Sequence, residues 1–106
     1  MNPAQRAAAI AAAQEIAGRL RTELAGLAPQ FIVRARELED AVMLNTELLL
    51  DGTIPFERAE ENIRKLGEAL KSEILVAGYR AKATAVGVTV NALGVFLRLL
   101  VGLLAQ

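Results

Sequence analysis

The chain has 106 residues, 54% of them hydrophobic but only 4% aromatic, and its 12 basic residues balance its 12 acidic residues. A net charge of zero argues against a nucleic-acid-binding protein that works through its overall field. The absence of Cys and His excludes disulfides and imidazole catalysis and removes the usual zinc ligands. A chain of this length forms one domain at most, and its apolar content of mainly Ala, Leu and Val suits close helix packing.

The N-terminal half carries the pattern of an amphipathic helix that is interrupted once. Asn2 and Pro3 predict a helix start, because Asn is a favourable cap and Pro fits the first helical position. Apolar residues then recur at spacings of three and four through residues 1–28, which are rich in Ala, and through residues 30–50. Pro29 predicts a kink or a short break, but the apolar phase is kept across it, which favours a kinked rod.

The stretch "LLLDGTIPFE" is the clearest turn signal in the chain. Asp51-Gly52 is suited to ending a helix, because glycine readily adopts left-handed geometry there, and Pro55 fits the first turn of the next helix. A short turn at 51–54 makes the flanking helices antiparallel. Because the turn lies near the midpoint, two unbroken arms would form a hairpin about 75 Å long.

The C-terminal half divides into a charged and an apolar helical segment. Residues 55–77 place apolar side chains on one face and i,i+4 pairs such as Glu60–Arg64 on another. Residues 78–105 continue the apolar spacing, and Gly78 marks a second point where an arm can bend. We therefore expect one all-α unit over 1–106, built as a long antiparallel helical hairpin with a kink near Pro29. The alternative is a compact three- or four-helix bundle, folded at Pro29 and Gly78, which buries more of the chain.

The apolar run from 83 to 105 is long enough to cross a bilayer, which takes about 20 residues. Every acid lies at or before Glu73, so residues 74–106 carry Arg80, Lys82 and Arg98 and no acid. Basic residues before an apolar run are typical of membrane anchors, whereas Arg98 within the run costs about 2.5–3.5 kcal/mol at the bilayer centre. The run is thus marginal as a lone span, and it needs cover from lipid, from the N-terminal arm or from other copies of the chain.

Two stripes follow this apolar segment. The Leu/Val seam comprises Val86, Val90, Leu93, Leu97, Leu100 and Leu104, and the small polar stripe beside it comprises Thr84, Gly87, Asn91, Gly94, Arg98 and Gly102. Small residues let helix backbones approach closely, and polar residues hydrogen-bond between helices. We expect the Leu/Val seam, with Gly87, Asn91, Gly94 and Arg98, to form an oligomer interface or a membrane contact.

No phosphate-binding loop, nucleophile elbow or metal-ligand cluster is recognisable in the sequence. We expect no enzyme, no catalytic, cofactor-binding or metal-ligating residues, no small-molecule substrate and no specific nucleic acid. The favoured function is a self-associating structural or assembly protein, such as a viral or phage-type virion or membrane-complex subunit, that oligomerises through its apolar C-terminal helix in coiled-coil fashion. The alternatives are a tail-anchored, membrane-active protein of holin type and a soluble adaptor that binds a partner helix. The Ala-rich start lacks the core of a signal peptide, so we expect a cytoplasmic or membrane-associated protein, virions included.

Overall fold

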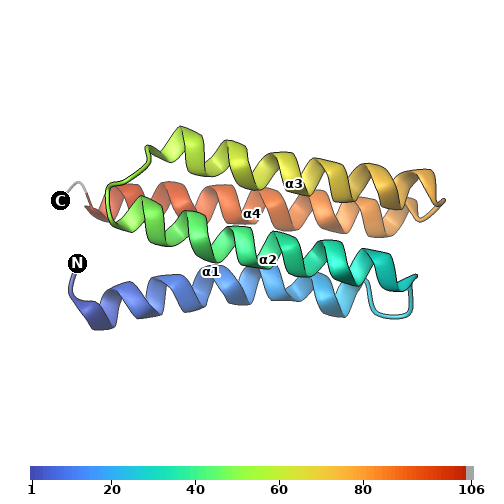
Figure 1. Ribbon diagram of the computed structural model, residues 1–106, viewed down its shortest axis with the longest axis horizontal. Coiled ribbons are helices and arrows are strands. Elements are labelled where there is room, and N and C mark those ends of the chain that lie inside the picture. Colours follow the sequence, from blue (N-terminus) through green and yellow to red (C-terminus); the bar gives the residue numbers. More distant parts are fainter. Residues whose placement is uncertain (105–106) are drawn as a thin grey trace.

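The computed structural model describes residues 1–104. This part of the chain contains four helices: α1 (Pro3–Glu23), α2 (Pro29–Leu50), α3 (Phe56–Val76) and α4 (Arg80–Leu104). Successive helices run in opposite directions, so the start of α1 and the end of α4 lie at the same end of the molecule (Figure 1). Each helix packs against the next in chain order, and α1 also packs against α4, which closes the ring. The fold is an up-and-down four-helix bundle, and the all-α prediction is confirmed in its compact form. The last residue of the predicted segment 78–105 lies outside the described residues.

The chain turns back at three places, where the long hairpin required only one. The molecule measures 45 × 23 × 18 Å, well short of the roughly 75 Å of an unbroken hairpin. The turn at 51–54 is present, but the arms on either side of it are each folded in two. Folding the arms lets the apolar stripes bury one another within a single chain, whereas a rod would leave them exposed until partners arrive.

Each of the three turns contains one glycine with a positive φ: 90° at Gly26, 72° at Gly52 and 94° at Gly78. Other residues adopt this left-handed geometry only at an energetic cost, so glycine marks the places where a helix can end and the chain reverse. Pro29 does not kink a continuous helix. It is the first residue of α2, where its missing N–H costs nothing, and the break before it is made at Gly26.

One stripe of each helix forms the core. Helix α1 contributes mainly small side chains, Ala9, Ala13 and Ala17, followed by Leu20 near its end. The other helices contribute larger ones; the fully buried large side chains of α2, α3 and α4 include Leu38, Val42, Leu70, Ile74, Val86, Leu93 and Leu97. The alanines of α1 therefore lie opposite the Leu-rich helix α4, and small residues facing large ones allow close packing.

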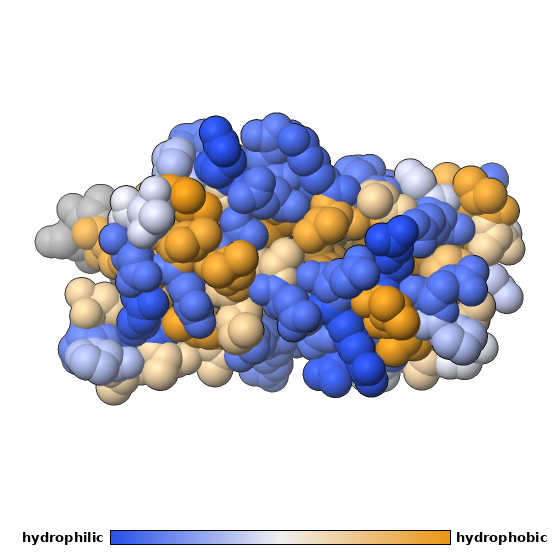
Figure 2. Space-filling model, viewed as in Figure 1, coloured by the Kyte–Doolittle hydropathy of each residue, from blue (hydrophilic) through white to orange (hydrophobic). Residues whose placement is uncertain are grey.

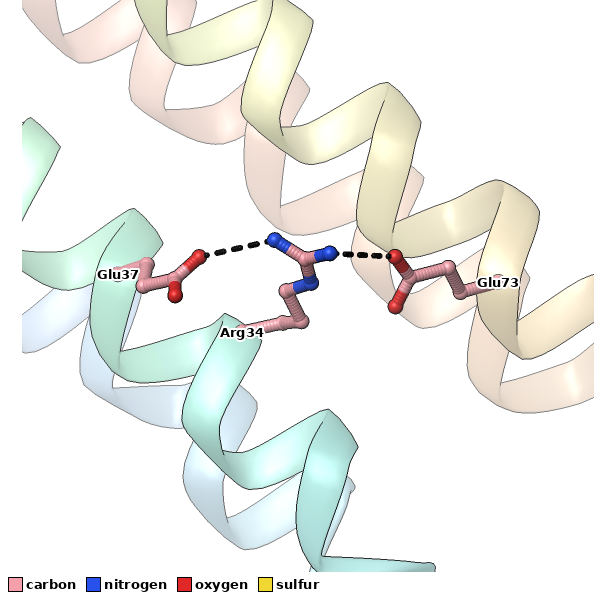
Figure 3. Close-up of polar contacts among 3 residues, drawn as sticks. All are labelled: Arg34, Glu37 and Glu73. Carbon is pink, nitrogen blue, oxygen red and sulfur yellow. Dashed lines mark hydrogen bonds and ion pairs between the residues drawn. The ribbon is translucent and has the colours of Figure 1, made fainter.

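Polar side chains connect α2 to α3. Asn45 is buried, donates a hydrogen bond to the carbonyl oxygen of Ala41 at 2.7 Å, and accepts one from Asn62 of α3 at 2.8 Å. Nearer the other end, the Arg34 guanidinium lies between Glu37 and Glu73, with a nitrogen–oxygen distance of 3.2 Å to each (Figure 3). The hydrogen bond with Glu37 and the charges of both carboxylates raise the pKa of Arg34 above its ordinary value. Such contacts set the register of the two helices more than they stabilise the fold.

The core position of Leu97 gives a test of the bundle. Leu97→Ala is expected to lower the free energy of unfolding by about 3 kcal/mol, because it removes a fully buried side chain and leaves a cavity. The control is Leu44→Ala on α2, where the side chain is exposed and the expected cost is under about 0.5 kcal/mol. Urea unfolding followed by circular dichroism measures both, and equal costs for the two variants would mean that Leu97 does not lie in the core.

Candidate association surface

The Leu/Val seam of α4 faces into the bundle. Val86, Leu93 and Leu97 are fully buried and Leu100 nearly so, Val90 is partly buried, and Leu104 is exposed near the chain end. The first four side chains pack in the core that α4 shares with its neighbours. A second protein can therefore contact them only if α4 leaves the bundle.

The small polar stripe lines a groove between α3 and α4 with a volume of about 390 Å³. The α4 side of the groove includes Gly87, Asn91, Gly94 and Arg98, all of which belong to that stripe. The α3 side is charged and carries Glu60, Arg64, Glu68 and Lys71. The structure thus brings together four of the predicted contact residues, and it places beside them a row of alternating charges that the sequence pattern did not associate with them.

Glycines set how closely α3 and α4 approach along this groove. Gly67 of α3 is buried directly against Val90, and a methyl group at position 67 would overlap Cγ2 of Val90. On α4, a methyl group at Gly87 would lie 3.6 Å from Nζ of Lys71, and one at Gly94 would lie 3.6 Å from Oε2 of Glu60. Long charged side chains of α3 therefore lie across the glycines of α4 and partly cover the helix backbone there.

Arg98 makes its intrachain contact with an aromatic ring. Its guanidinium carbon lies 4.8 Å from the centre of the Phe56 ring, at the start of α3, in a cation–π arrangement. Because residues 74–106 contain no acid, a carboxylate partner for Arg98 would come from another helix or another chain. Across residues 1–104 no ion pair involves Arg98, although Glu60 lines the same groove.

The outer face of α4 is apolar as well. Val88, Val95, Leu99 and Leu103 are 64, 62, 64 and 59% exposed. These side chains were not among the predicted contact residues, because the regular Leu/Val seam drew the prediction to the inner face. The sequence holds a signal for two of them, Val88 and Val95: Thr84, Val88, Asn91, Val95, Arg98 and Gly102 follow one another at spacings of four and three, and all six are exposed. We call these six residues the outward strip.

Helix α1 extends the apolar area beside the outward strip. Lys82 of α4 pairs with Glu23 of α1 at 3.7 Å, which identifies the edge of α1 that adjoins α4. Positions in phase with Glu23 on that edge include the uncharged Ile16, Ala12 and Ala8, and one charged residue, the exposed Arg19, near the end of α1. The face seen in Figure 2, over α2 and its neighbours, differs, because hydrophilic side chains divide its apolar area into separate patches.

Helix α4 also has the length and composition of a membrane span, the one helix of the described chain that does. Only 28% of its most apolar window is buried in the bundle. Residues 1–104 contain no group of three or more carboxylates placed to hold a metal ion. The candidate site is therefore a surface, with α4 at its centre.

The contact between Gly67 and Val90 can be tested by a pair of substitutions. Gly67→Ala is expected to destabilise the bundle by about 1–3 kcal/mol, because the added methyl group meets a stiff β-branched side chain in a packed interface. In a Val90→Ala background the same change should be neutral or stabilising, since alanine is the better helix former. Gly102→Ala, which adds a methyl group to open space, is the control. Additive effects of the two substitutions would contradict the contact.

Comparisons with known proteins do not assign the chain to a family. No protein-family model matches it, and neither the curated proteins nor the solved structures gave a match.

Proposed function

We propose that this protein is a non-enzymatic structural or assembly subunit that self-associates through the outer face of α4. The observation that carries the proposal is the exposure of Val88, Val95, Leu99 and Leu103, four large apolar side chains on one side of one helix. Contiguous apolar surface on a soluble protein marks an interaction site more often than chance exposure does. The class of assembly that this favours includes virion and membrane-complex subunits of viral or phage type.

The arrangement of charge supports an interface at α4 over one elsewhere. Residues 74–106 carry only three charged side chains, and two of these, Arg80 and Lys82, lie at the start of the helix. The other three helices carry acids and bases along their exposed faces, as a solvated surface does. Interface centres are typically depleted in charge, so the outer face of α4 is the part of the molecule that resembles one.

Residues 1–104 leave this face of the bundle uncovered. Helix α4 packs between α3 and α1, and its inner seam is already buried there. Burying an exposed Val or Leu side chain gains about 1.5–3 kcal/mol when it is complete, so covering four such side chains provides a sizeable driving force for association. Part of this gain offsets the entropy that two molecules lose when they bind.

A membrane role is the second candidate, and one observation favours it. Helix α4 is apolar on both faces and long enough to span a bilayer, while only 28% of its apolar window is buried. In this alternative α4 leaves the bundle and enters lipid, as in a tail-anchored, holin-like protein. Asn91 and Arg98 in the middle of the outward strip weigh against it, because each would need a polar partner inside the hydrocarbon. For the remaining alternative, a soluble adaptor that binds a partner helix, no particular contact speaks in favour.

Self-association should be lost when a charge is placed on the outer face of α4. The wild-type chain is expected to be dimeric or larger at micromolar concentration without detergent, and Val95→Glu to be monomeric, because a carboxylate would be desolvated in the interface. The control is Val33→Glu on α2, where the side chain is similarly exposed; it should leave the oligomer intact. Size-exclusion chromatography with light scattering gives the masses, and circular dichroism checks that both variants fold. A monomeric wild-type chain would overturn the proposal.

Incubation with vesicles separates the two candidate functions. The association proposal predicts that the protein stays in the aqueous fraction when mixed with vesicles containing zwitterionic and anionic lipids, and that mild detergent does not change its mass. The membrane alternative predicts that the protein floats with the vesicles and resists extraction by carbonate, because an inserted helix is held by hydrophobic burial and not by charge. Flotation that survives carbonate would replace the first proposal by the second.

A further inference from the structure

We propose that two copies of this chain pack α4 against α4 in antiparallel orientation, about a two-fold axis close to Val95, with Arg98 of each chain opposite Asn91 of the other. This inference rests on the proposed function and specifies the partner of the same surface. It commits the outward strip to a second copy of the chain and gives Arg98 and Asn91 a shared role.

The spacing of the outward strip suits a helix–helix seam. Thr84, Asn91 and Arg98 are separated by seven residues each, and so are Val88, Val95 and Gly102. Two interleaved rows of this kind, at alternating spacings of four and three, are the pattern by which one helix packs along another. Helix α4 thus carries two seams on opposite sides: the inner one is buried in the bundle, and the outer one is exposed along its length.

Charge selects the relative direction of the two helices. The described part of α4 is basic only, with Arg80 and Lys82 at its start and Arg98 near its end. A parallel pair in register would place each of these cations beside its own copy, and like charges facing each other destabilise an interface. In an antiparallel pair, Arg80 and Lys82 of one copy lie at one end of the contact, and those of the other copy lie at the opposite end. At each end the two cations lie near the negative end of the partner's helix dipole.

Arg98 and Asn91 are complementary in the antiparallel pair. With the axis close to Val95, the two positions lie at nearly equal distances on either side of it, so each Arg98 comes to the level of the partner's Asn91. Phe56 covers one face of the guanidinium, but the N–H groups project in the plane of the group and remain able to donate. Among residues 1–104 the amide of Asn91 has no side-chain hydrogen bond and Arg98 has no ion pair. Each therefore offers the other a free group.

The outer face is large enough for a stable two-fold contact. The bundle is 45 Å long and 23 or 18 Å across, and α4 runs along most of that length (Figure 1). A stable protein interface covers about 800 Å² on each partner, which a face of these dimensions can supply when the adjoining edge of α1 takes part. Ala8 and Ala12 keep long side chains away from an approaching helix along the first part of that edge. Gly102, where an added methyl group would meet open space, similarly allows the two backbones to come close.

Cysteine cross-linking tests the orientation in a chain that has no native Cys. Val88→Cys and Gly102→Cys are prepared as separate chains, one of them with a size tag, and each is oxidised alone and then in a mixture. In the antiparallel pair the two copies of position 88 lie about 20 Å apart along the helices, which is beyond the roughly 7 Å that a disulfide spans. We expect a cross-link between the two different chains in the mixture and none in Val88→Cys alone. Val95→Cys, close to the axis, should cross-link by itself and serves as the positive control.

The outcomes separate this inference from the proposed function. A dimer in which Val88→Cys links to itself, and in which the mixture adds no mixed product, overturns the antiparallel arrangement and leaves self-association through α4 intact. The arrangement is also overturned if the Val95→Cys variant forms a dimer but does not cross-link with itself, because the contact then lies elsewhere. A chain that is monomeric by light scattering overturns both the arrangement and the proposed function.

A charge substitution gives a second measurement that does not depend on oxidation. Asn91→Glu places a carboxylate opposite Arg98 of the partner in the antiparallel pair, so the dimer should bind roughly fivefold more tightly at low salt, and the gain should shrink as salt is added. In a parallel pair the new carboxylate faces its own copy and weakens binding. Weaker association of Asn91→Glu, with an unchanged circular dichroism spectrum, would contradict the arrangement.

Discussion

The structure depends on how the other three helices cover the inner face of α4. That helix supplies Val86, Leu93 and Leu97 to the centre of the bundle, and α1, α3 and the facing side of α2 close around them. Alanines on α1 and Gly67 on α3 let the neighbouring helices approach closely enough to do this. The remaining features, namely the groove beside α3, the ring contact of Arg98 and the exposed outer face, follow from α4 being buried on one side only.

The fold class could be read from the sequence because its signals are local. The cap at Asn2 forms as the sequence suggests, with the side-chain oxygen accepting a hydrogen bond from the backbone N–H of Gln5. Asp51-Gly52 ends one helix and Pro55 precedes the next, since a left-handed glycine and a proline at a helix start each act over a few residues. Spacings of three and four identify the buried face of every helix, and the bundle buries most of the residues that those spacings mark, although Leu66 and Leu104 are exposed.

The choice between rod and bundle could not be read in the same way. The spacing of apolar residues continues in phase across Pro29, and this continuity is compatible with one straight helix and equally with two helices that share a core. The turn is made at Gly26, three residues before the proline, by a residue whose positive φ gives no signal in an apolar pattern. What decides the outcome is the burial of one arm's stripe against the other, a long-range term that local signals do not contain. The same limit applies to the outer face of α4: the spacing of the outward strip is visible in the sequence, but the exposure of its residues is a property of the assembled bundle.

Arg98 combines a contact within the chain with a charge that stays at the surface of α4. Within the chain it stacks on Phe56, so the aliphatic stem and one face of the guanidinium shield part of the groove between α3 and α4. The charge itself stays at the surface, in the outward strip, where the adjoining large side chains are Val95 and Leu99. An isolated cation among exposed apolar side chains weakens a contact with lipid, and it weakens a contact with a second helix much less when that helix presents an amide. Because α4 carries Asn91 one heptad away from Arg98, a second copy of α4 meets that condition when it lies in the opposite direction.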